Sequence, residues 1–323
     1  MISVVLMAGY QNKREVKRYS KIVAEHYGES FFETGYRPLR EFQTLENGVP
    51  VNKPLIQYTL ERLFQMNTVG DITVVGHQML IEQRLKSFLA TAPKPLKIVN
   101  QNRRLSNGLV DQFKIEKRQV KYNSIAGNLV KGYWASKAAK TRRHALFVAA
   151  DSPLTTVDFL EKFIDSSREL SEKSAVIVPA VFINGREDKL GRKPLWLIND
   201  SPYPISGYTD PHGRQGFRLS SLLMANPYFF DINTVNTAYN LRKFLSPKVQ
   251  IRLFKITREL GFSNVYAKHF IKKDLSVTDC EKITSRFFRG TLSILPLEGE
   301  TASYDYDGTE KEYQMISSML TGT

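Results

Sequence analysis

The sequence contains a single cysteine, Cys280, so the chain can form no internal disulfide bond. A chain without disulfides is typical of a reducing compartment, and we therefore expect a cytoplasmic protein. Every apolar run is shorter than the roughly 20 residues that a membrane-spanning helix needs, so no membrane span is expected. The apolar opening, residues 1–8, has neither a basic leader nor a cleavage site after it, which favours a strand over a signal peptide.

Patterns that mark several classes of enzyme are also missing. The five histidines are far apart in the sequence, and no pair has the spacing of zinc ligands. No Gly-X-Gly-X-X-Gly segment follows the first apolar run, which disfavours an NAD-dependent enzyme of the Rossmann type. No Ser-His-Asp or Cys-His pattern is present, so nothing points to catalysis by a side-chain nucleophile.

The composition indicates a globular protein with an anionic partner. The 323 residues are enough for one large domain or two ordinary ones, and 42% of them are hydrophobic. Basic residues outnumber acidic ones by 46 to 32, which gives a net charge of +14. Such an excess leaves open a nucleotide, a phosphorylated substrate, a nucleic acid or a membrane surface as the partner.

A short apolar run ends at a carboxylate near the middle of the chain. Residues 145–150 are all apolar, and Asp151 follows them. This pattern is typical of a strand buried on both faces of a parallel sheet, and ligands of such sheets bind beyond the carboxyl ends of the strands. Thr155 and Thr156 can then cap a helix that begins near Val157. We therefore expect Asp151 to hold a hard cation such as Mg²⁺, which prefers carboxylate oxygen.

Strand-like runs alternate with helical patterns along most of the chain. Strands are expected at residues 2–7, 71–76, 96–99, 145–150, 174–180 and 291–297. Helices are expected at residues 52–64, 78–90, 125–139, from 157, over much of 232–288 and from 309, with loops at 10–51 and 100–123. This alternation predicts an α/β fold with a mostly parallel, doubly wound sheet and a largely helical C-terminal insertion. The expected division is a core over 1–199, a mixed loop and helical insertion over 200–289, and a return to the core over 290–323.

A second acidic segment lies near the C-terminus. Asp305 and Asp307 lie on the same face of the chain if it is extended there. Thr309 and Glu312 have the spacing of a capping box, so a last helix is expected to begin at this point. Two interpretations are open: the segment converges with Asp151 on one cation, or it is a solvated turn before the helix.

Two polar stretches gather basic residues. The first, residues 10–51, is either cover for a ligand site or a solvated helix over about 15–26. The second, residues 210–218, interleaves glycines with three basic side chains, and is either an anion-binding loop for an acceptor or an exposed basic turn. The acceptor-binding candidates in the second stretch are His212, Arg214 and Arg218.

Four segments in the same order resemble the motifs of one enzyme group. They are Val4-Val-Leu-Met-Ala-Gly9, Lys53-Pro-Leu-Ile-Gln-Tyr-Thr-Leu-Glu61, Val148-Ala-Ala-Asp-Ser-Pro-Leu154 and Asp305-Tyr-Asp-Gly-Thr-Glu-Lys-Glu-Tyr313. They are similar to the Leu-Ala-Ala-Gly opening, the Gly-Lys-Pro-Leu-Ile segment, the metal-aspartate segment and the closing Asp-X-Asp motif of the MobA-like and sugar-phosphate nucleotidyltransferases, which have a GT-A-like fold. The resemblance covers residues 1–180 and about 290–323, and not the middle of the chain.

The resemblance implies a nucleoside triphosphate held over the strand tips together with Mg²⁺. The nucleotide-binding positions that it implies are Met7, Ala8, Gly9, Lys53, Gly127 and Asn128. The catalytic positions are Asp151, Lys13, Arg14 and Arg37, and the implied metal ligands are Asp151, Asp305 and Asp307. In such a site a small anionic acceptor attacks the α-phosphate and pyrophosphate leaves, with the metal ion neutralising charge.

The sequence also departs from the family pattern. The compact Gly-X-Gly-X-Arg phosphate loop is absent after Gly9, and Arg37 stands in for the lysine segment. A GT-A glycosyltransferase with a nucleotide-sugar donor and a non-catalytic nucleotide-binding protein therefore stay open as alternatives. The motifs favour the nucleotidyltransferase, with no nucleic acid as partner, and leave room for a homodimer formed through the helices of 232–288.

Overall fold

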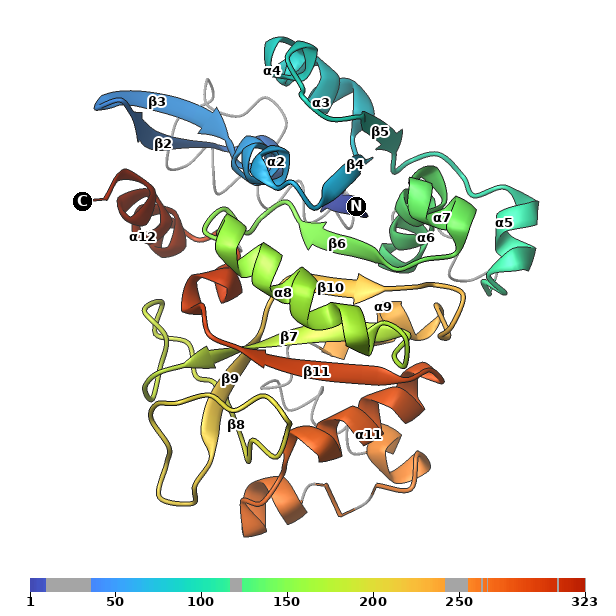
Figure 1. The fold of residues 1–323 in the computed structure, drawn as a ribbon, viewed down its shortest axis with the longest axis vertical. Coiled ribbons are helices and arrows are strands. Elements are labelled where there is room, and N and C mark those ends of the chain that lie inside the picture. Colours follow the sequence, from blue (N-terminus) through green and yellow to red (C-terminus); the bar gives the residue numbers. More distant parts are fainter. Residues whose placement is uncertain are drawn as a thin grey trace.

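Nine strands within the described residues form one sheet at the centre of the molecule (Figure 1). The computed structural model describes residues 1–9, 36–116, 124–241, 255–262, 264–265, 267–306 and 308–322. The order across the sheet is β5-β4-β1-β6-β10-β7-β9-β8, and β11 pairs with β7. The strands are β1 (Ile2–Ala8), β4 (Val69–Gly76), β5 (Leu96–Asn100), β6 (Ala145–Ala149), β7 (Val176–Ile183), β8 (Leu195–Leu197), β9 (Gln215–Leu219), β10 (Leu222–Ala225) and β11 (Leu292–Leu297).

The first half of the sheet is parallel. β1 lies between β4 and β6, with Val5 beside Thr73 on one side and Phe147 on the other, and β5 pairs with the far side of β4. The carboxyl ends of these four strands therefore meet at one edge of the sheet, where Asp151 follows β6. The expected class, an α/β fold with mostly parallel central strands, is confirmed.

The second half of the sheet is mixed. One stretch, residues 215–225, runs antiparallel to β7: its first part, β9, pairs with β8 as well, and its second part, β10, pairs with β6. β11 lies parallel to β7 on the other side. Both β9 and β10 lie in the 200–289 segment, for which the sequence predicted loop and helix. Runs of four or five residues are too short for periodicity to identify them as strands, and β9 also contains the polar residues Gln215 and Arg218.

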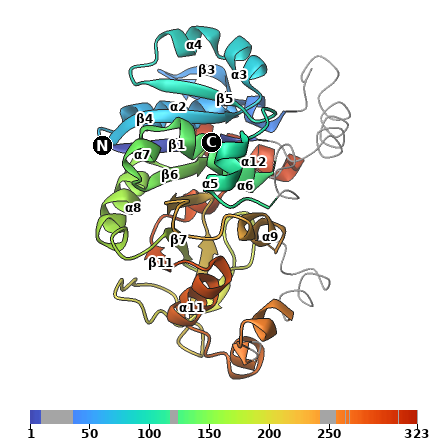
Figure 2. The same cartoon turned by 90° about the vertical axis from the view of Figure 1, so that its right-hand side faces the viewer.

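Helices cover both faces of the sheet because side chains alternate along each strand. Val4 and Leu6 pack in one buried cluster with side chains of α2 (Leu55–Gln65) and α8 (Val157–Leu170), whereas Val5 packs in the other cluster with side chains of α6 (Ile125–Ala135). Figure 2 shows α8 and α9 (Thr234–Leu241) on opposite sides of β7. At Gly132 a Cβ atom would lie 2.2 Å from Cγ1 of Val5, so only glycine allows the helix to approach β1 this closely.

The longer helices largely follow the expected pattern. They are α2 (Leu55–Gln65), α3 (Gln78–Arg84), α4 (Lys86–Ala90), α5 (Asn107–Gln112), α6 (Ile125–Ala135), α7 (Lys137–Thr141), α8 (Val157–Leu170), α9 (Thr234–Leu241), α11 (Val277–Phe288) and α12 (Glu310–Thr321). Shorter turns are η2 (Arg37–Leu39), η5 (Glu300–Ser303) and the π-helical η4 (Ala267–Lys272). Thr156 caps α8, and Thr309 with Glu312 forms the capping box of α12, as the sequence predicted. No described helix combines the length and the apolar character that crossing a membrane requires.

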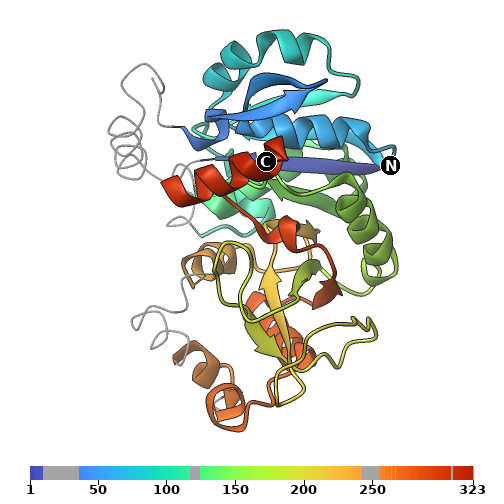
Figure 3. The same ribbon diagram turned by 90° about the vertical axis from the view of Figure 1, so that its left-hand side faces the viewer.

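Three local expectations were wrong. The helix expected over residues 52–64 begins only at Leu55, because Asn52 lies in β3 (Val49–Pro54), opposite Gln43 of β2 (Glu41–Glu46). These two strands also lie largely within residues 10–51, where a loop was expected. The segment 100–123 is not loop throughout, because Ser106 accepts a hydrogen bond from the backbone of Leu109 and begins α5. The β2–β3 hairpin packs against α12, where Thr44 Oγ1 donates to Leu320 O at 3.3 Å (Figure 3).

Candidate functional site

The closing acidic segment lies directly beside the tip of β6. The backbone N–H of Tyr306 donates to the carbonyl oxygen of Asp151 at 2.8 Å, although 155 positions separate the two residues in the sequence. Asp305 therefore directly precedes, in the sequence, a residue that is hydrogen-bonded to Asp151. Asp307, the other implied ligand in this segment, lies outside the described residues.

Arg37 joins these two acidic segments. Its Nη1 donates to Tyr306 O at 2.9 Å and lies 3.8 Å from Oδ2 of Asp151. The side chains of Arg37 and Asp151 are 30% and 25% exposed, so both can still reach a ligand. Of the predicted cations, Arg37 therefore lies at the carboxyl end of β6, whereas Lys13 and Arg14 lie outside the described residues.

Aromatic packing fixes the position of the segment that carries Arg37. The guanidinium group of Arg40 is fully buried and lies 4.0 Å from the ring centre of Tyr313 and 4.9 Å from that of Tyr306. Cation–π contacts of this kind gain strength where water is excluded. The short helix η2 is thus held against both the closing segment and α12.

The carboxylate of Asp305 is held by a second arginine. Arg192 donates from Nη1 to Asp305 Oδ1 at 2.9 Å, from Nη2 to Ser303 O at 2.8 Å, and from Nε to Asp188 Oδ2 at 2.8 Å. Burial alone would lower the pKa of Arg192, but the charges and hydrogen bonds of Asp188 and Asp305 outweigh it and raise the pKa. A metal ion at Asp305 would therefore have to share that carboxylate with Arg192.

Two side-chain amides converge on Gly9 at the end of β1. A Cβ atom at Gly9 would lie 2.9 Å from Oε1 of Gln101 and 3.0 Å from Nδ2 of Asn128, so any larger residue would displace these amides. Oδ1 of Asn128 is buried and accepts no hydrogen bond from the described residues. The carbonyls of Met7 and Ala8 are used within the protein, by the N–H of Ala150 and the hydroxyl of Tyr36.

The sequence did not point to Gln101, which is completely buried and follows directly after β5. The rule that drew attention to Asp151, a polar side chain at the carboxyl end of a parallel strand, applies equally to Gln101. The neighbouring Lys131 donates to the carbonyl oxygen of Gln101, and burial lowers the pKa of this lysine to about 8.

Two of the implied nucleotide-binding positions have structural partners. The N–H of Gly127 donates to Oγ of Ser124 at 3.0 Å and forms the cap of α6. The ammonium group of Lys53 lies between Glu61, at 2.8 Å from both oxygens, and Glu46. Burial would lower the pKa of Lys53, but these two carboxylates raise it overall. The charge of Lys53 is thus balanced by carboxylates within the protein.

The predicted acceptor-binding arginines are also ion-paired. Arg214 donates from Nε and Nη2 to Asp210 Oδ2 at 2.9 and 2.6 Å. Arg218 lies 3.5 Å from Asp188 through Nε and donates from Nη1 to Lys193 O at 3.3 Å. The backbone N–H of His212 donates to Asp210, and its side chain is exposed. The structure thus brings His212 and Arg214 together on Asp210, whereas Arg218 pairs with a different aspartate, Asp188, and both arginines have a counter-charge.

The comparisons with known proteins identify the fold. No protein-family model matches the chain, and no curated protein matches its sequence. Among solved structures, a hypothetical transferase from Thermus thermophilus superposes with a TM-score of 0.55 at 15% identity, over 97% of this chain and 99% of the other. CMP:2-keto-3-deoxy-manno-octonic acid synthetase complexed with CTP superposes with a TM-score of 0.52 at 11% identity, over 99% and 98%. The chain therefore shares the fold of these two structures over 97% and 99% of its length, and one of them is a synthetase complexed with a nucleoside triphosphate.

Proposed function

We propose that this protein is a Mg²⁺-dependent nucleotidyltransferase that transfers a nucleoside monophosphate from a nucleoside triphosphate to a small phosphorylated acceptor, a sugar phosphate or an alcohol phosphate. The observation that carries the proposal is the hydrogen bond from Tyr306 to Asp151, with Arg37 in contact with both residues. It brings two acidic segments and a cation to the carboxyl end of β6, where ligands of such sheets bind.

The carboxylates near β6 suit a magnesium ion. Among the described residues no three His, Cys, Asp or Glu side chains form a ready-made metal cluster. Mg²⁺ in phosphate-transferring sites usually needs only one or two carboxylates, because phosphate oxygens and waters complete its shell. Asp151, with Asp307 or Asp305 as its partner, would hold the ion, which when bound neutralises charge on the phosphates.

The remaining residues have roles in binding and positioning. Arg37 would bind the phosphates through charge-assisted hydrogen bonds, with Lys13 and Arg14 as further candidates. The amide of Asn128, whose Oδ1 accepts no hydrogen bond from the described residues, suits the edge of a base lying over Gly9. In the reaction an acceptor oxygen forms a bond to the α-phosphorus, the bond to the bridging oxygen breaks, and pyrophosphate leaves with that electron pair.

The structural comparison supports a nucleoside triphosphate as the ligand, since one solved structure with this fold is complexed with CTP. A second candidate function, nucleotide binding without catalysis, is favoured by one observation. Asp305, an implied metal ligand, already forms an ion pair with Arg192.

A pyrophosphate-release screen separates the two functions. The protein is mixed with each of the four nucleoside triphosphates, Mg²⁺ and pools of sugar phosphates or alcohol phosphates. Transfer predicts pyrophosphate with at least one pair, and no release when EDTA replaces Mg²⁺. Binding of a triphosphate by calorimetry without pyrophosphate from any pool would favour the non-catalytic protein. In a parallel screen with nucleotide sugars in place of the triphosphates, consumption of a nucleotide sugar would favour a glycosyltransferase.

A further inference from the structure

The positive charge of this protein is concentrated in one part of the sequence. Residues 101–144 contain eleven basic and two acidic residues, a net charge of +9 within a chain whose total is +14. This stretch includes α6 and α7, which pack on one face of the sheet, and α5, which lies beside them (Figures 1 and 2). Seven of its basic residues are exposed in the structure: Arg103, Arg104, Lys114, Lys137, Lys140, Arg142 and Arg143.

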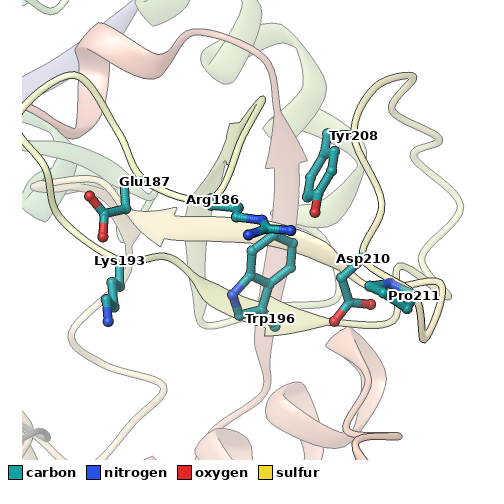
Figure 4. Close-up of a pocket in the computed structure, with 7 residues that line it drawn as sticks. All are labelled: Arg186, Glu187, Lys193, Trp196, Tyr208, Asp210 and Pro211. Carbon is teal, nitrogen blue, oxygen red and sulfur yellow. The ribbon is translucent and has the colours of Figure 1, made fainter.

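These seven cations have no counter-charge. Their side chains form no ion pair or hydrogen bond with any residue that the structure describes. Elsewhere on the surface basic side chains are mixed with carboxylates, as in the pocket beside β8 and β9, where Arg186 and Lys193 occur together with Glu187 and Asp210 (Figure 4). Unpaired cations on one face produce a positive potential that attracts an extended anion.

An exposed tryptophan lies among these cations. Trp134, at the end of α6, is 46% exposed, and its ring meets that of Phe113 edge to face, with centres 6.5 Å apart. Phe113 also packs on Tyr228, with ring centres 4.8 Å apart. The guanidinium group of Arg142 lies 5.2 Å from the centre of the Tyr228 ring. The indole ring and Arg142 are thus connected through two aromatic rings and belong to one continuous surface.

Backbone contacts fix the segment that carries two of the arginines. Arg142 ends α7 with a φ of 49°, and its carbonyl oxygen accepts from Nδ2 of Asn226 at 2.6 Å. The carbonyl oxygen of Arg143 accepts from the hydroxyl group of Tyr133 at 2.8 Å. Both donors belong to buried residues. Because this backbone is already ordered, less entropy is lost when the two side chains bind a phosphate.

The combination of a ring with cations matches one class of anion. In proteins that bind single-stranded nucleic acid, bases stack on aromatic rings while basic side chains contact the phosphates. The bases of a duplex are stacked on one another, so they offer no free face to an indole ring. A lipid surface fits less well, since membrane binding grows with the apolar area that is buried. Among the described residues of 101–144, Trp134 is the one large apolar side chain that is exposed.

From these contacts we infer that this face of the protein binds single-stranded nucleic acid. Its contact residues, which we refer to as the basic patch, are Lys114, Trp134, Lys137, Lys140, Arg142 and Arg143. Trp134 stacks on a base, and the cations bind the phosphates around it.

The basic patch is separate from the site proposed above. Arg142 and Arg143 lie just before β6, whereas Asp151 follows the carboxyl end of that strand. The four sequence motifs concern a free nucleotide at the carboxyl ends of the strands, so they gave no reason to expect a nucleic acid. The inference goes beyond the proposed function and does not rest on it.

The two tryptophans of the chain make the test direct. In the Trp196→Phe protein, Trp134 is the remaining tryptophan and reports binding through its fluorescence. This protein is titrated with short oligo(U), oligo(A) and oligo(dT), with a duplex DNA of the same length, and with vesicles of phosphatidylcholine and phosphatidylglycerol. Saturable quenching is expected with the single strands, and binding of the duplex should be at least about fivefold weaker. Four phosphate contacts predict a slope of about −3 for log K against log salt concentration.

Variants separate the basic patch from the net charge. Lys137→Glu combined with Lys140→Glu is expected to weaken binding of the single strands at least about tenfold. The matched control combines Lys86→Glu with Lys162→Glu, at exposed positions of α4 and α8, which pack in the other buried cluster. It changes the net charge equally and should weaken binding less than about threefold. Trp134→Ala, followed by the anisotropy of a labelled oligonucleotide, should weaken binding at least about fivefold.

Four outcomes would overturn the inference. Equal losses in the two double variants would mean that net charge alone attracts the oligonucleotide. A Trp134 signal with vesicles and none with oligonucleotides would assign the face to a membrane surface. Duplex DNA that binds as tightly as the single strands would exclude stacking on the indole ring. Binding that survives both Trp134→Ala and the Lys137 and Lys140 substitutions would place the nucleic acid elsewhere on the protein.

Discussion

Nη1 of Arg192 lies 2.9 Å from Oδ1 of Asp305, and the same arginine bonds to Asp188, whose side chain is fully buried. The segment after β7 is in this way attached to the segment that follows η5. The attachment involves a buried charge, so loss of the Arg192 side chain leaves Asp188 with the backbone N–H of residue 192 and with Arg218 at 3.5 Å as its cation. Removing the closest partner of a buried carboxylate strongly lowers the stability of the folded protein.

Arg192→Met is therefore expected to lower the free energy of unfolding by about 3 kcal/mol, measured by urea denaturation. Arg168→Met is the matched control, because the ion pair of Arg168 with Asp165 is exposed on both sides. Exposed pairs contribute little, so a loss below about 1 kcal/mol is expected there. Equal losses of unfolding free energy in the two variants would show that the buried ion pairs of Arg192 stabilise the protein no more than an exposed pair does.

Asp151→Asn is expected to lower kcat at least about 100-fold, because the carboxylate charge that would hold the metal ion is lost. The fold should be retained, since Tyr306 bonds to the backbone of Asp151 and not to its side chain. Thermal melting checks the fold, and pyrophosphate release measures the activity. Asp165→Asn on the exposed face of α8 serves as the control. Normal turnover in Asp151→Asn would exclude this carboxylate from the chemistry.

Arg37→Ala is expected to raise the KM for the triphosphate roughly tenfold with a smaller change in kcat, because a charge-assisted phosphate contact is lost. Arg37→Lys should recover only part of this, since an ammonium group lacks the planar fork of a guanidinium group. Steady-state kinetics at saturating acceptor measure both constants. Arg84→Ala, which removes an exposed partner of Glu41, is the control. An unchanged KM in Arg37→Ala would remove Arg37 from the site.

Two glycine substitutions should change stability in opposite directions. Gly132→Ala places a Cβ atom 2.2 Å from Val5 and 2.8 Å from Val75, so a loss of about 1–3 kcal/mol is expected. Gly108→Ala in α5 meets no atom within 4 Å, so a gain of up to about 1 kcal/mol is expected from helix propensity. Urea denaturation of both proteins provides the measurement. A stabilised Gly132→Ala would mean that α6 does not approach β1 as described.

Lys131 should make stability depend on pH. Burial lowers the pKa of its ammonium group from 10.5 to about 8, so between these values the unfolded chain binds a proton that the folded protein releases. Stability contributed by the wild-type lysine therefore rises as the pH increases from about 8 toward 10.5. The difference in unfolding free energy between wild type and Lys131→Met, measured from pH 7 to 10, isolates this effect. If this difference in unfolding free energy did not change from pH 7 to 10, the side chain of Lys131 would be exposed to water and not buried.

The parts of the structure that could be predicted are those with a local signal. The apolar run before Asp151 and the capping box of Thr309 and Glu312 each lie within a few residues, and both are confirmed. The β2–β3 hairpin also carried a local signal, Asn47-Gly48, whose two residues have φ values of 50° and 80°. Such a pair is a strong hairpin turn signal, yet a long polar loop was expected there.

The parts that could not be predicted depend on contacts between distant segments. Arg37 and Tyr306 are 269 positions apart, and their hydrogen bond depends on the folded sheet. The sequence shows Arg186 and Arg214 as equally basic, although only Arg214 has an aspartate beside it in the structure. Which cations are free to bind a ligand is therefore a property of the fold, and the roles of all the candidate residues stay predictions until they are tested.

The stretch that forms β9 and β10 limits how this protein can change. Its first part borders β8, which carries Trp196, and the carbonyl of Ser221 accepts from Ala149 at the tip of β6. Side chains alternate between the two faces of a sheet along each strand. One residue inserted between Leu219 and Leu222 would therefore move the side chains of either β9 or β10 to the opposite face. The spacing between β8 and the tip of β6 is therefore set by a single continuous length of backbone, which tolerates substitution more readily than insertion.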